Sequence, residues 1–133
     1  MTDRVQSVDD LLAEARRELD RLSPTEAFEA SRRGCLLIDI RSDSQRAADG
    51  VIREATFVSR NVLEWRLDPD SEHRDPALAR RDRQVVVICN EGYQSSLAAA
   101  NLRRLGLDAT DMIGGFQAWR EAGLPVDTAR SDA

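Results

Sequence analysis

Two continuous apolar runs constrain the fold of this chain more than any other feature of its sequence. They are CLLIDIR at residues 35–41 and QVVVIC at residues 84–89, and neither alternates apolar with polar residues as a half-exposed strand would. Strands of this kind are covered on both faces, which is typical of parallel sheets flanked by helices. The two runs therefore predict an α/β fold.

Helical and strand-like segments alternate along the rest of the chain. Ser7 is a candidate N-cap for a helix over residues 7–22, and Ser23, Pro24 and Glu26 form the start of a second helix that stops at Gly34. Further helices are expected at SDSQRAAD, NVLEWR, SSLAAANLRRLG and FQAWREAG, weaker strands at TFVS and TDMI, and a polar surface loop at residues 67–83. This order predicts an α/β sandwich with right-handed crossovers.

Composition restricts the partners of such a domain. The chain has 133 residues, a formal net charge of -5, and 41% hydrophobic and 32% charged residues, as in an ordinary globular domain. Nucleic-acid binding is not expected, because phosphate contacts require a basic face. The N-terminus lacks the apolar core of a signal peptide and VVVI is too short to cross a bilayer, so we expect a cytoplasmic protein without membrane contact. Two cysteines and one histidine, His73, do not fill a zinc site, and no metal or organic cofactor is expected.

Cys89 ends the second apolar run and is followed by a short loop and an alanine-rich segment. Ligands of open parallel α/β sheets bind beyond the carboxyl ends of the strands, which is where Cys89 is expected. Gly92 permits a close turn, and Ser95 or Ser96 is a candidate cap for the following helix. Loop amides and the helix dipole would then favour a thiolate nucleophile that needs no histidine base. The alternative is a buried strand-end cysteine without chemistry.

Cys35 opens its strand, whereas Cys89 ends one. Parallel strands of about five residues would separate the two by roughly 15 Å. Because a disulfide requires Cα atoms within about 7 Å, we expect neither a bridge nor a resolving role, and Cys35 is interpreted as a core residue.

The segments LLIDIRSDSQRAADGVIREA and VVVICNEGYQSSLAAANLRRLGLDATDMIGGFQAWREAGLPV together resemble the single-domain rhodaneses, a sulfurtransferase family. The resemblance covers residues 24–126, which leaves residues 1–23 as an extra N-terminal helix and residues 127–133 as a frayed C-terminal tail. It implies a rhodanese-like three-layer α/β/α sandwich with a five-stranded parallel sheet. It also implies that Cys89 carries a sulfane sulfur as a persulfide.

The implied function is sulfur transfer by a ping-pong route, in which Cys89 takes sulfur from a donor and passes it to a thiol or another nucleophile. The expected partners are a small-molecule donor (thiosulfate, mercaptopyruvate or a persulfide) with a thiol acceptor, or a sulfur-carrier protein. Amides of residues 90–95 would stabilise the persulfide, with Ser95 and Ser96 as hydroxyl donors. Beside the catalytic Cys89, the candidate site contains Asn90, Glu91, Gly92, Tyr93, Gln94, Ser95, Ser96, Arg41 and Arg60.

The chain departs from the family pattern in three places. Residues 50–55, GVIREA, replace the family's Gly-His-Ile-Pro-Gly-Ala, with little consequence expected for the fold. Loop positions that often hold Arg or Lys in thiosulfate-using members are Asn90, Glu91 and Gln94, so a dianionic donor would depend on loop amides or on Arg41 and Arg60. The extra N-terminal helix either packs on the domain or mediates self-association as a homodimer.

Three other functions were weighed against sulfur transfer. A non-catalytic rhodanese-like binding or regulatory module and a thiol redox sensor remain open, since a thiolate oxidises readily. A cysteine-dependent phosphatase is disfavoured, because Ser95 occupies the arginine position of a Cys-x5-Arg loop and Glu91 would repel a phosphate.

Several side chains near these motifs have expected structural roles. Asp39 and Arg41 are expected to form an ion pair at the end of a strand. Tyr93 is expected at the mouth of the pocket. Both tryptophans, Trp65 and Trp119, are expected to pack in the core.

Overall fold

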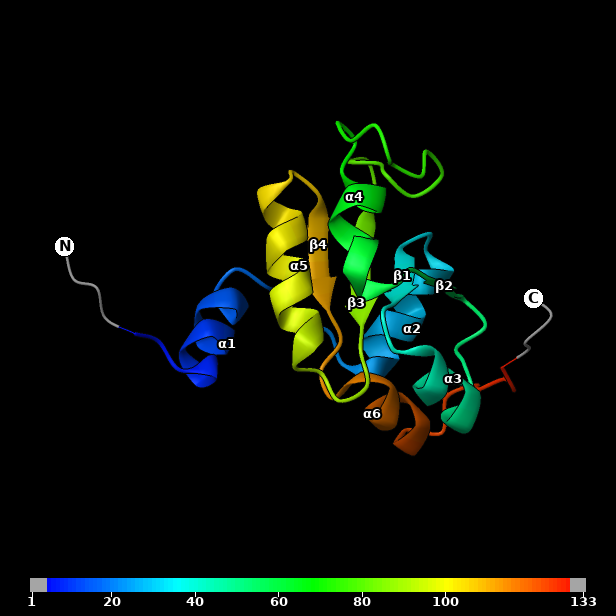
Figure 1. Cartoon of the computed structure of the whole chain (residues 1–133). Coiled ribbons are helices and arrows are strands. Elements are labelled where there is room, and N and C mark those ends of the chain that lie inside the picture. The colour runs from blue at the N-terminus through cyan, green and yellow to red at the C-terminus, as the bar shows by residue number, and fades with distance from the viewer. Residues whose placement is uncertain (1–4, 130–133) are drawn as a thin grey trace.

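The two apolar runs form the central strands of a parallel sheet. β1 (Leu36–Asp39) and β3 (Gln84–Ile88) pair with each other, and Leu37 lies opposite Val86. In the computed structural model, which describes residues 5–129, β2 (Ala55–Phe57) flanks β1 and β4 (Asp108–Asp111) flanks β3 (Figure 1). All three pairings are parallel, which confirms the sheet that the runs predicted.

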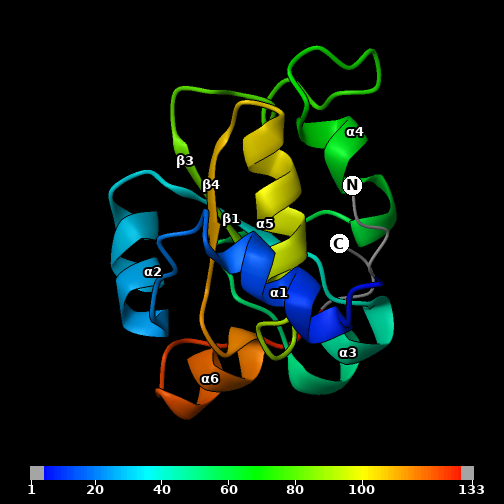
Figure 2. The same cartoon turned by 90° about the vertical axis from the view of Figure 1, so that its left-hand side faces the viewer.

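Helices cover both faces of this sheet. α5 (Gln94–Arg104) and α4 (Leu63–Leu67) lie on one face, and α1 (Val8–Arg16) lies on the outer side of α5 (Figure 2). α2 (Pro24–Arg32) lies on the opposite face, where it contacts α6 (Gly115–Glu121). The remaining elements are α3 (Asp43–Asp49) and the 3₁₀ turn η1 (Arg60–Val62). The helical layers on either side confirm the α/β sandwich.

Successive residues of the central strands face opposite cores. Val85 and Val87 contribute to the core under α4 and α5, whereas Val86 and Ile88 contribute to the core that contains Phe116 of α6. All four side chains are fully buried. The absence of alternation in the sequence therefore has its expected cause, because both faces of β3 are covered.

The expected fifth strand is not present among the described residues. Leu22 forms a single parallel bridge with Met112, through the bonds Leu22 N to Asp111 O (3.0 Å) and Ile113 N to Leu22 O (2.8 Å). The next residue, Ser23, already caps α2, and Pro24 has no amide proton to donate. The segment beside β4 is therefore too short for a ladder, and the sheet has four strands.

The start signals of the first two helices were predicted correctly, but the length of the first helix was not. Ser7 and Ser23 both form complete capping boxes, as expected. The first helix ends at Arg16, not at residue 22, and the chain then turns back toward the sheet so that Leu19 is buried. α4 ends at Leu67, and residues 68–83 contain turns and no helix, which confirms the expected loop.

One expectation about burial and one about the C-terminal tail differ from the structure. Trp119 is fully buried as expected, but Trp65 is 56% exposed on α4. The expected frayed tail begins too early at residue 127, because Asp127 pairs with Val51 through backbone bonds of 2.7 and 2.8 Å. The last residues of that tail, 130–133, and residues 1–4 of the N-terminal segment lie outside the described residues.

No helix within residues 5–129 has the length and apolar character needed to cross a membrane.

Candidate active site

The Cys89 side chain lies where β3 ends and the loop to α5 begins. Only 6% of the residue is exposed, and its sulfur belongs to the core on the α5 side of the sheet. The amide of Gly92 donates a hydrogen bond to Cys89 Sγ over 3.1 Å, and the amide of Ser95 donates a second over 3.3 Å. Two backbone donors converging on one sulfur form a site suited to a sulfur anion.

The loop closes tightly around this sulfur. Gly92 has φ +89, and a Cβ there would lie 2.7 Å from the backbone nitrogen of Gly114 in the turn before α6. The first turn of α6 is also bonded to the start of the loop, since Phe116 N donates to Cys89 O over 2.8 Å. The predicted close turn at Gly92 is confirmed, and it is required because the loop and the turn before α6 are in direct backbone contact.

Asp111, at the carboxyl end of β4, organises the start of α5. This carboxylate is fully buried, and its Oδ2 accepts hydrogen bonds from Ser95 Oγ at 2.8 Å and Ser96 Oγ at 2.7 Å. Each hydroxyl has one proton, so neither proton is directed at the sulfur. The predicted capping role was also wrong: α5 begins at Gln94 with Tyr93 as N-cap and no side-chain cap. Ser95 approaches the sulfur through its amide.

The two arginines expected near the pocket have different surroundings. Arg41 is buried, pairs with Asp39 over 2.9 Å and donates to Gly50 O over 2.8 Å, so the structural ion pair is present and this cation does not lean over the loop. Arg60 does reach the loop, where its Nε donates to Gln94 Oε1 over 3.2 Å. Its Nη1 also donates to Glu64 Oε1 over 2.8 Å.

The remaining loop side chains line the rim of the site. Asn90 Oδ1 accepts a bond from Gln117 Nε2 over 3.0 Å, and this bond joins the loop to α6. Glu91 is exposed, and Tyr93 is 60% exposed on the outside of the loop. The loop therefore presents one acidic side chain and no basic one.

Glu64 and Cys35 are among the titratable groups whose pKa values are moved by their surroundings. Partial burial would raise the pKa of Glu64, but hydrogen bonds from Asn101 and Arg60 outweigh it and hold the pKa below its usual value. Burial raises the pKa of the Cys35 thiol, which lies at the opposite end of the sheet from Cys89 and donates to Gln84 Oε1 over 3.2 Å. Both cysteines are free thiols. Cys35 is therefore a weak competitor for electrophiles at neutral pH.

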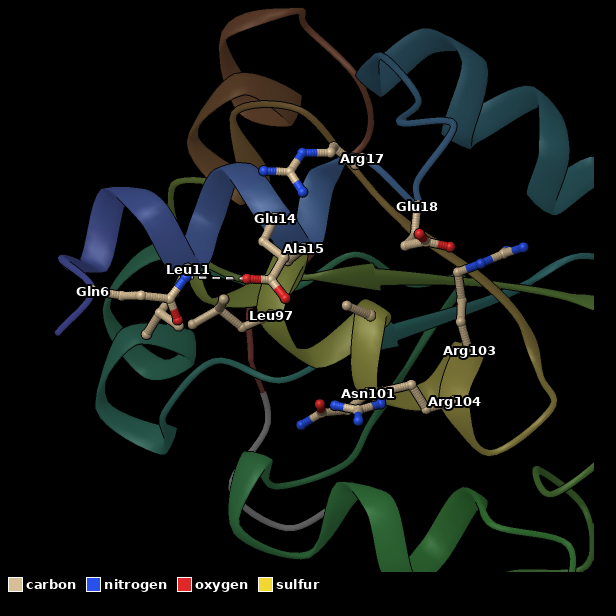
Figure 3. Close-up of a pocket in the computed structure, with 11 residues that line it drawn as sticks. Gln6, Leu11, Glu14, Ala15, Arg17, Glu18, Leu97, Asn101, Arg103 and Arg104 are labelled. Carbon is tan, nitrogen blue, oxygen red and sulfur yellow. Dashed lines mark hydrogen bonds between the residues drawn. The ribbon is translucent and has the colours of Figure 1, made fainter. Parts of the chain in front are cut away.

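A groove of about 720 Å³ lies elsewhere, between α1 and α5 (Figure 3). Leu11 and Ala15 of α1 face Leu97 of α5 there, with charged side chains such as Glu18 and Arg103 at the rim. No residue from 89 to 96 lines this groove. The site is therefore assigned from the bonds to the Cys89 sulfur, not from the groove.

Residues 5–129 contain no group of three or more His, Cys, Asp or Glu side chains that could hold a metal ion.

Sequence reasoning missed three residues that surround the loop: Asp111, Arg16 and Arg21. Asp111 had a usable signal, because it is the one acidic residue of the predicted strand TDMI; in the structure it ends β4, which lies beside β3. The two arginines had none. They contact the Gly92 carbonyl from the N-terminal segment, more than 70 positions away in the chain.

Comparison with known proteins agrees with this geometry. A family model described as rhodanese-like domain matches residues 23–122. The thiosulfate sulfurtransferase GlpE of Pseudomonas savastanoi pv. phaseolicola is 33% identical over 121 residues, which cover 85% of this chain and 97% of that relative.

Solved structures have the same fold. A protein from Rhodopseudomonas palustris, described as of unknown function and a possible tyrosine phosphatase, superimposes with a TM-score of 0.84 at 30% identity, covering 96% of this chain and 99% of that one. The polysulfide-sulfur transferase homodimer of Wolinella succinogenes gives a TM-score of 0.68 at 26% identity, covering 92% and 88%. With a family match over most of its length and a cysteine loop at the end of a central parallel strand, the chain belongs to the rhodanese-like domain family.

Proposed function

We propose that the protein is a sulfurtransferase that carries sulfane sulfur as a persulfide on Cys89 and passes it to a thiol or another nucleophile. The observation that carries this proposal is the pair of backbone amides, from Gly92 and Ser95, that donate to Cys89 Sγ. Relatives named thiosulfate sulfurtransferase, at 29% to 34% identity, support the same class of reaction.

In the first step the Cys89 thiolate attacks the outer sulfur of the donor. A new S–S bond forms, and the bond from that sulfur to the rest of the donor breaks; with thiosulfate, the electron pair leaves on sulfite. The amides of Gly92 and Ser95 hold the attacking sulfur in place. No other described residue accepts a hydrogen bond from the amides of Tyr93 and Gln94, so these amides are available to the outer sulfur.

In the second step the acceptor thiol attacks the outer sulfur of the persulfide. The S–S bond to Cys89 breaks, and its electron pair returns to Cys89 as the thiolate, while the acceptor becomes a persulfide. Because the enzyme alternates between two covalent forms, the kinetics are ping-pong. The reaction uses no metal or organic cofactor.

The charges at the rim affect which sulfur donor the site favours. Glu91 is the loop's one charged side chain, and the Arg60 cation is shared with Glu64. Glu91 and the paired Arg60 therefore provide a thiosulfate dianion with no uncompensated positive charge. On this argument a low-molecular-weight persulfide, mercaptopyruvate or a sulfur-carrier protein is as suitable a donor as thiosulfate.

We also propose the bounds of the domain, its oligomeric state and its location. Residues 24–126 form the sulfurtransferase domain, and the N-terminal segment 1–23 is an addition to it. Val8 and Leu11 of α1 are exposed apolar side chains, which supports a homodimer through this helix. A cytoplasmic location, without a membrane or nucleic-acid partner, follows from the sequence argument alone.

Intact-protein mass spectrometry tests the central step. Wild type, Cys89→Ser and Cys35→Ser are each exposed to thiosulfate, mercaptopyruvate and glutathione persulfide. We expect wild type and Cys35→Ser to gain the mass of one sulfur atom with at least one donor, and Cys89→Ser to gain none. Reduction with excess thiol should remove the added mass.

Absence of loading with every donor would overturn the proposal and favour a binding module or a redox sensor. A phosphatase is not favoured, because Ser95 stands where a phosphate-binding arginine is needed and its hydroxyl donates to Asp111. Hydrolysis of an aryl phosphate that depends on Cys89 would contradict that judgement.

A further inference from the structure

We propose that Arg16 and Arg21 are positioning residues for Cys89, which hold the catalytic loop in its sulfur-binding conformation and bring to it the positive charge that its own side chains lack. This inference rests on the proposed sulfurtransferase function. Both arginines precede residue 23, where the match to the family model begins. Through these two residues the N-terminal segment has a role in the site.

Arg16 reaches the loop because α1 packs along the N-terminal half of α5 (Figure 2). It is in the last turn of α1 and is partly buried. Its Nη2 donates to Gly92 O over 2.8 Å, and its Nε donates to Ser96 Oγ over 3.0 Å. Its guanidinium also lies over the Tyr93 ring, 5.9 Å from the centroid. One side chain thus contacts the loop and the first turn of α5.

Arg21 approaches the same carbonyl from the segment that precedes α2. Its Nη2 donates to Gly92 O over 3.0 Å and to Asp111 Oδ2 over 3.2 Å, and its Nε donates to Asp111 Oδ1 over 2.8 Å. The bridge between Leu22 and Met112 holds the adjacent backbone against β4. The arginine is therefore anchored on the sheet, and it extends that anchor to the loop.

The Gly92 carbonyl is the point on which both guanidinium groups converge. Gly92 also supplies, through its amide, the shorter of the two hydrogen bonds to Cys89 Sγ. The peptide group before Gly92 is thus held by the sulfur, and the peptide group after it is held by the two arginines. Without the arginines the partly buried carbonyl would lose both of its charged donors, and the amide would no longer be held toward the sulfur.

Arg16 differs from the other charged groups around the loop. Arg21 is paired with Asp111, and Arg60 with Glu64, while Glu91 points to solvent. Asp49 reaches the loop only through Gln117, which also bonds Asn90. Within the described part of the chain Arg16 forms no ion pair; its partners are a carbonyl, a hydroxyl and an aromatic ring. Its charge is therefore not neutralised and favours an anion in the loop.

The experiment measures how fast Cys89 is alkylated by iodoacetamide from pH 5 to pH 10, in a Cys35→Ser background. Arg16→Met keeps an unbranched apolar side chain in place of the arginine stem but removes its charge and donors. Arg17→Met makes the same change one residue along, at an exposed position, and serves as the matched control. We expect Arg16→Met to react about tenfold more slowly at pH 7, as for loss of one charge-assisted hydrogen bond, and its profile to move to higher pH. Arg17→Met should follow the parent.

Two further variants separate charge from packing. Arg16→Lys keeps the charge and should recover part of the rate, because an ammonium group can replace one of the two hydrogen bonds. Arg21→Lys tests the second donor without removing the partner of Asp111. Circular dichroism and urea unfolding of each variant exclude global unfolding as the cause of a slower rate.

Equal rates and equal pH profiles for Arg16→Met, Arg17→Met and the parent would overturn the inference. A slow Arg16→Met variant whose Arg16→Lys counterpart has no recovery would also contradict the charge argument. Alkylation needs no sulfur donor, so this result is independent of whether wild type is loaded with sulfur. Failure of the proposed function and failure of the arginine inference can thus be told apart.

Discussion

Replacement of Gly92 by alanine tests how strictly the structure determines the shape of the Cys89 loop. The substitution is expected to lower the free energy of unfolding for two reasons. The residue has φ +89, a region that costs an L-amino acid about 1–2 kcal/mol. A Cβ would also lie 2.7 Å from Gly114 N, a backbone atom that cannot rotate away, and overpacking of this kind costs about 1–3 kcal/mol. Together these give a loss of about 2–5 kcal/mol in the free energy of unfolding.

The matched control is Gly34→Ala. Gly34 has φ +100, and nothing lies within 4 Å of the position a Cβ would take. This variant therefore carries the conformational cost of about 1–2 kcal/mol without the steric one. The difference between the two variants isolates the contact between the loop and the turn before α6.

The loop can also relieve the clash by moving, which would withdraw the Gly92 amide from Cys89 Sγ. A hydrogen bond to a charged group contributes about 1.5–3 kcal/mol, so the reactivity of Cys89 at neutral pH should fall about 10-fold to 100-fold. Urea unfolding measures the stability, and iodoacetamide alkylation in a Cys35→Ser background measures the reactivity. If Gly92→Ala equals Gly34→Ala in both measurements, the packing argument for the loop is refuted.

Because burial raises the pKa of Cys35, its thiol should be alkylated slowly at pH 7, which peptide mapping of the alkylated protein can show. The Cys35→Ser variant should still be loaded with sulfur, which intact-protein mass spectrometry can show. The pKa of Glu64 is lowered by Asn101 and Arg60 despite partial burial, so its stabilising effect should be present above the unfolded value of about 4.3 and be lost as pH falls through the lower folded value. Urea unfolding of Glu64→Gln should therefore have a flatter acid dependence. Trp119→Ala, which empties a fully buried site, should lose about 3–5 kcal/mol by the same method.

Features that depend on near neighbours in the chain could be predicted from the sequence. The apolar runs identified β1 and β3 because burial of both strand faces excludes polar residues from them. Ser7 and Ser23 marked helix starts because a capping box closes within four residues. Helix length was harder to predict, because residues 17–22 have helical periodicity but turn back so that Leu22 can meet Met112.

The candidate site shows the same difference between contacts of near neighbours and contacts of distant residues. Cys89 and Gly92 were recognised because a strand, a short loop and a helix are adjacent in the chain. The destinations of Ser95 and Ser96 were not, because their acceptor, Asp111, comes from another strand. Arg41 was also named as a candidate site residue, but the ion pair with Asp39, which the sequence did predict, and a bond to the Gly50 carbonyl hold it in a buried position.

The sequence by itself determined the class of fold, the parallel central strands and the position of Cys89 at a strand end. These follow from hydrophobic pattern and from contacts that span a few residues. Only the tertiary structure decided which charges reach the loop, since Arg16 and Arg21 meet the Gly92 carbonyl across separations of 76 and 71 positions. A local sequence pattern does not predict such contacts, because they form only when α1 packs on α5 and the chain passes beside β4.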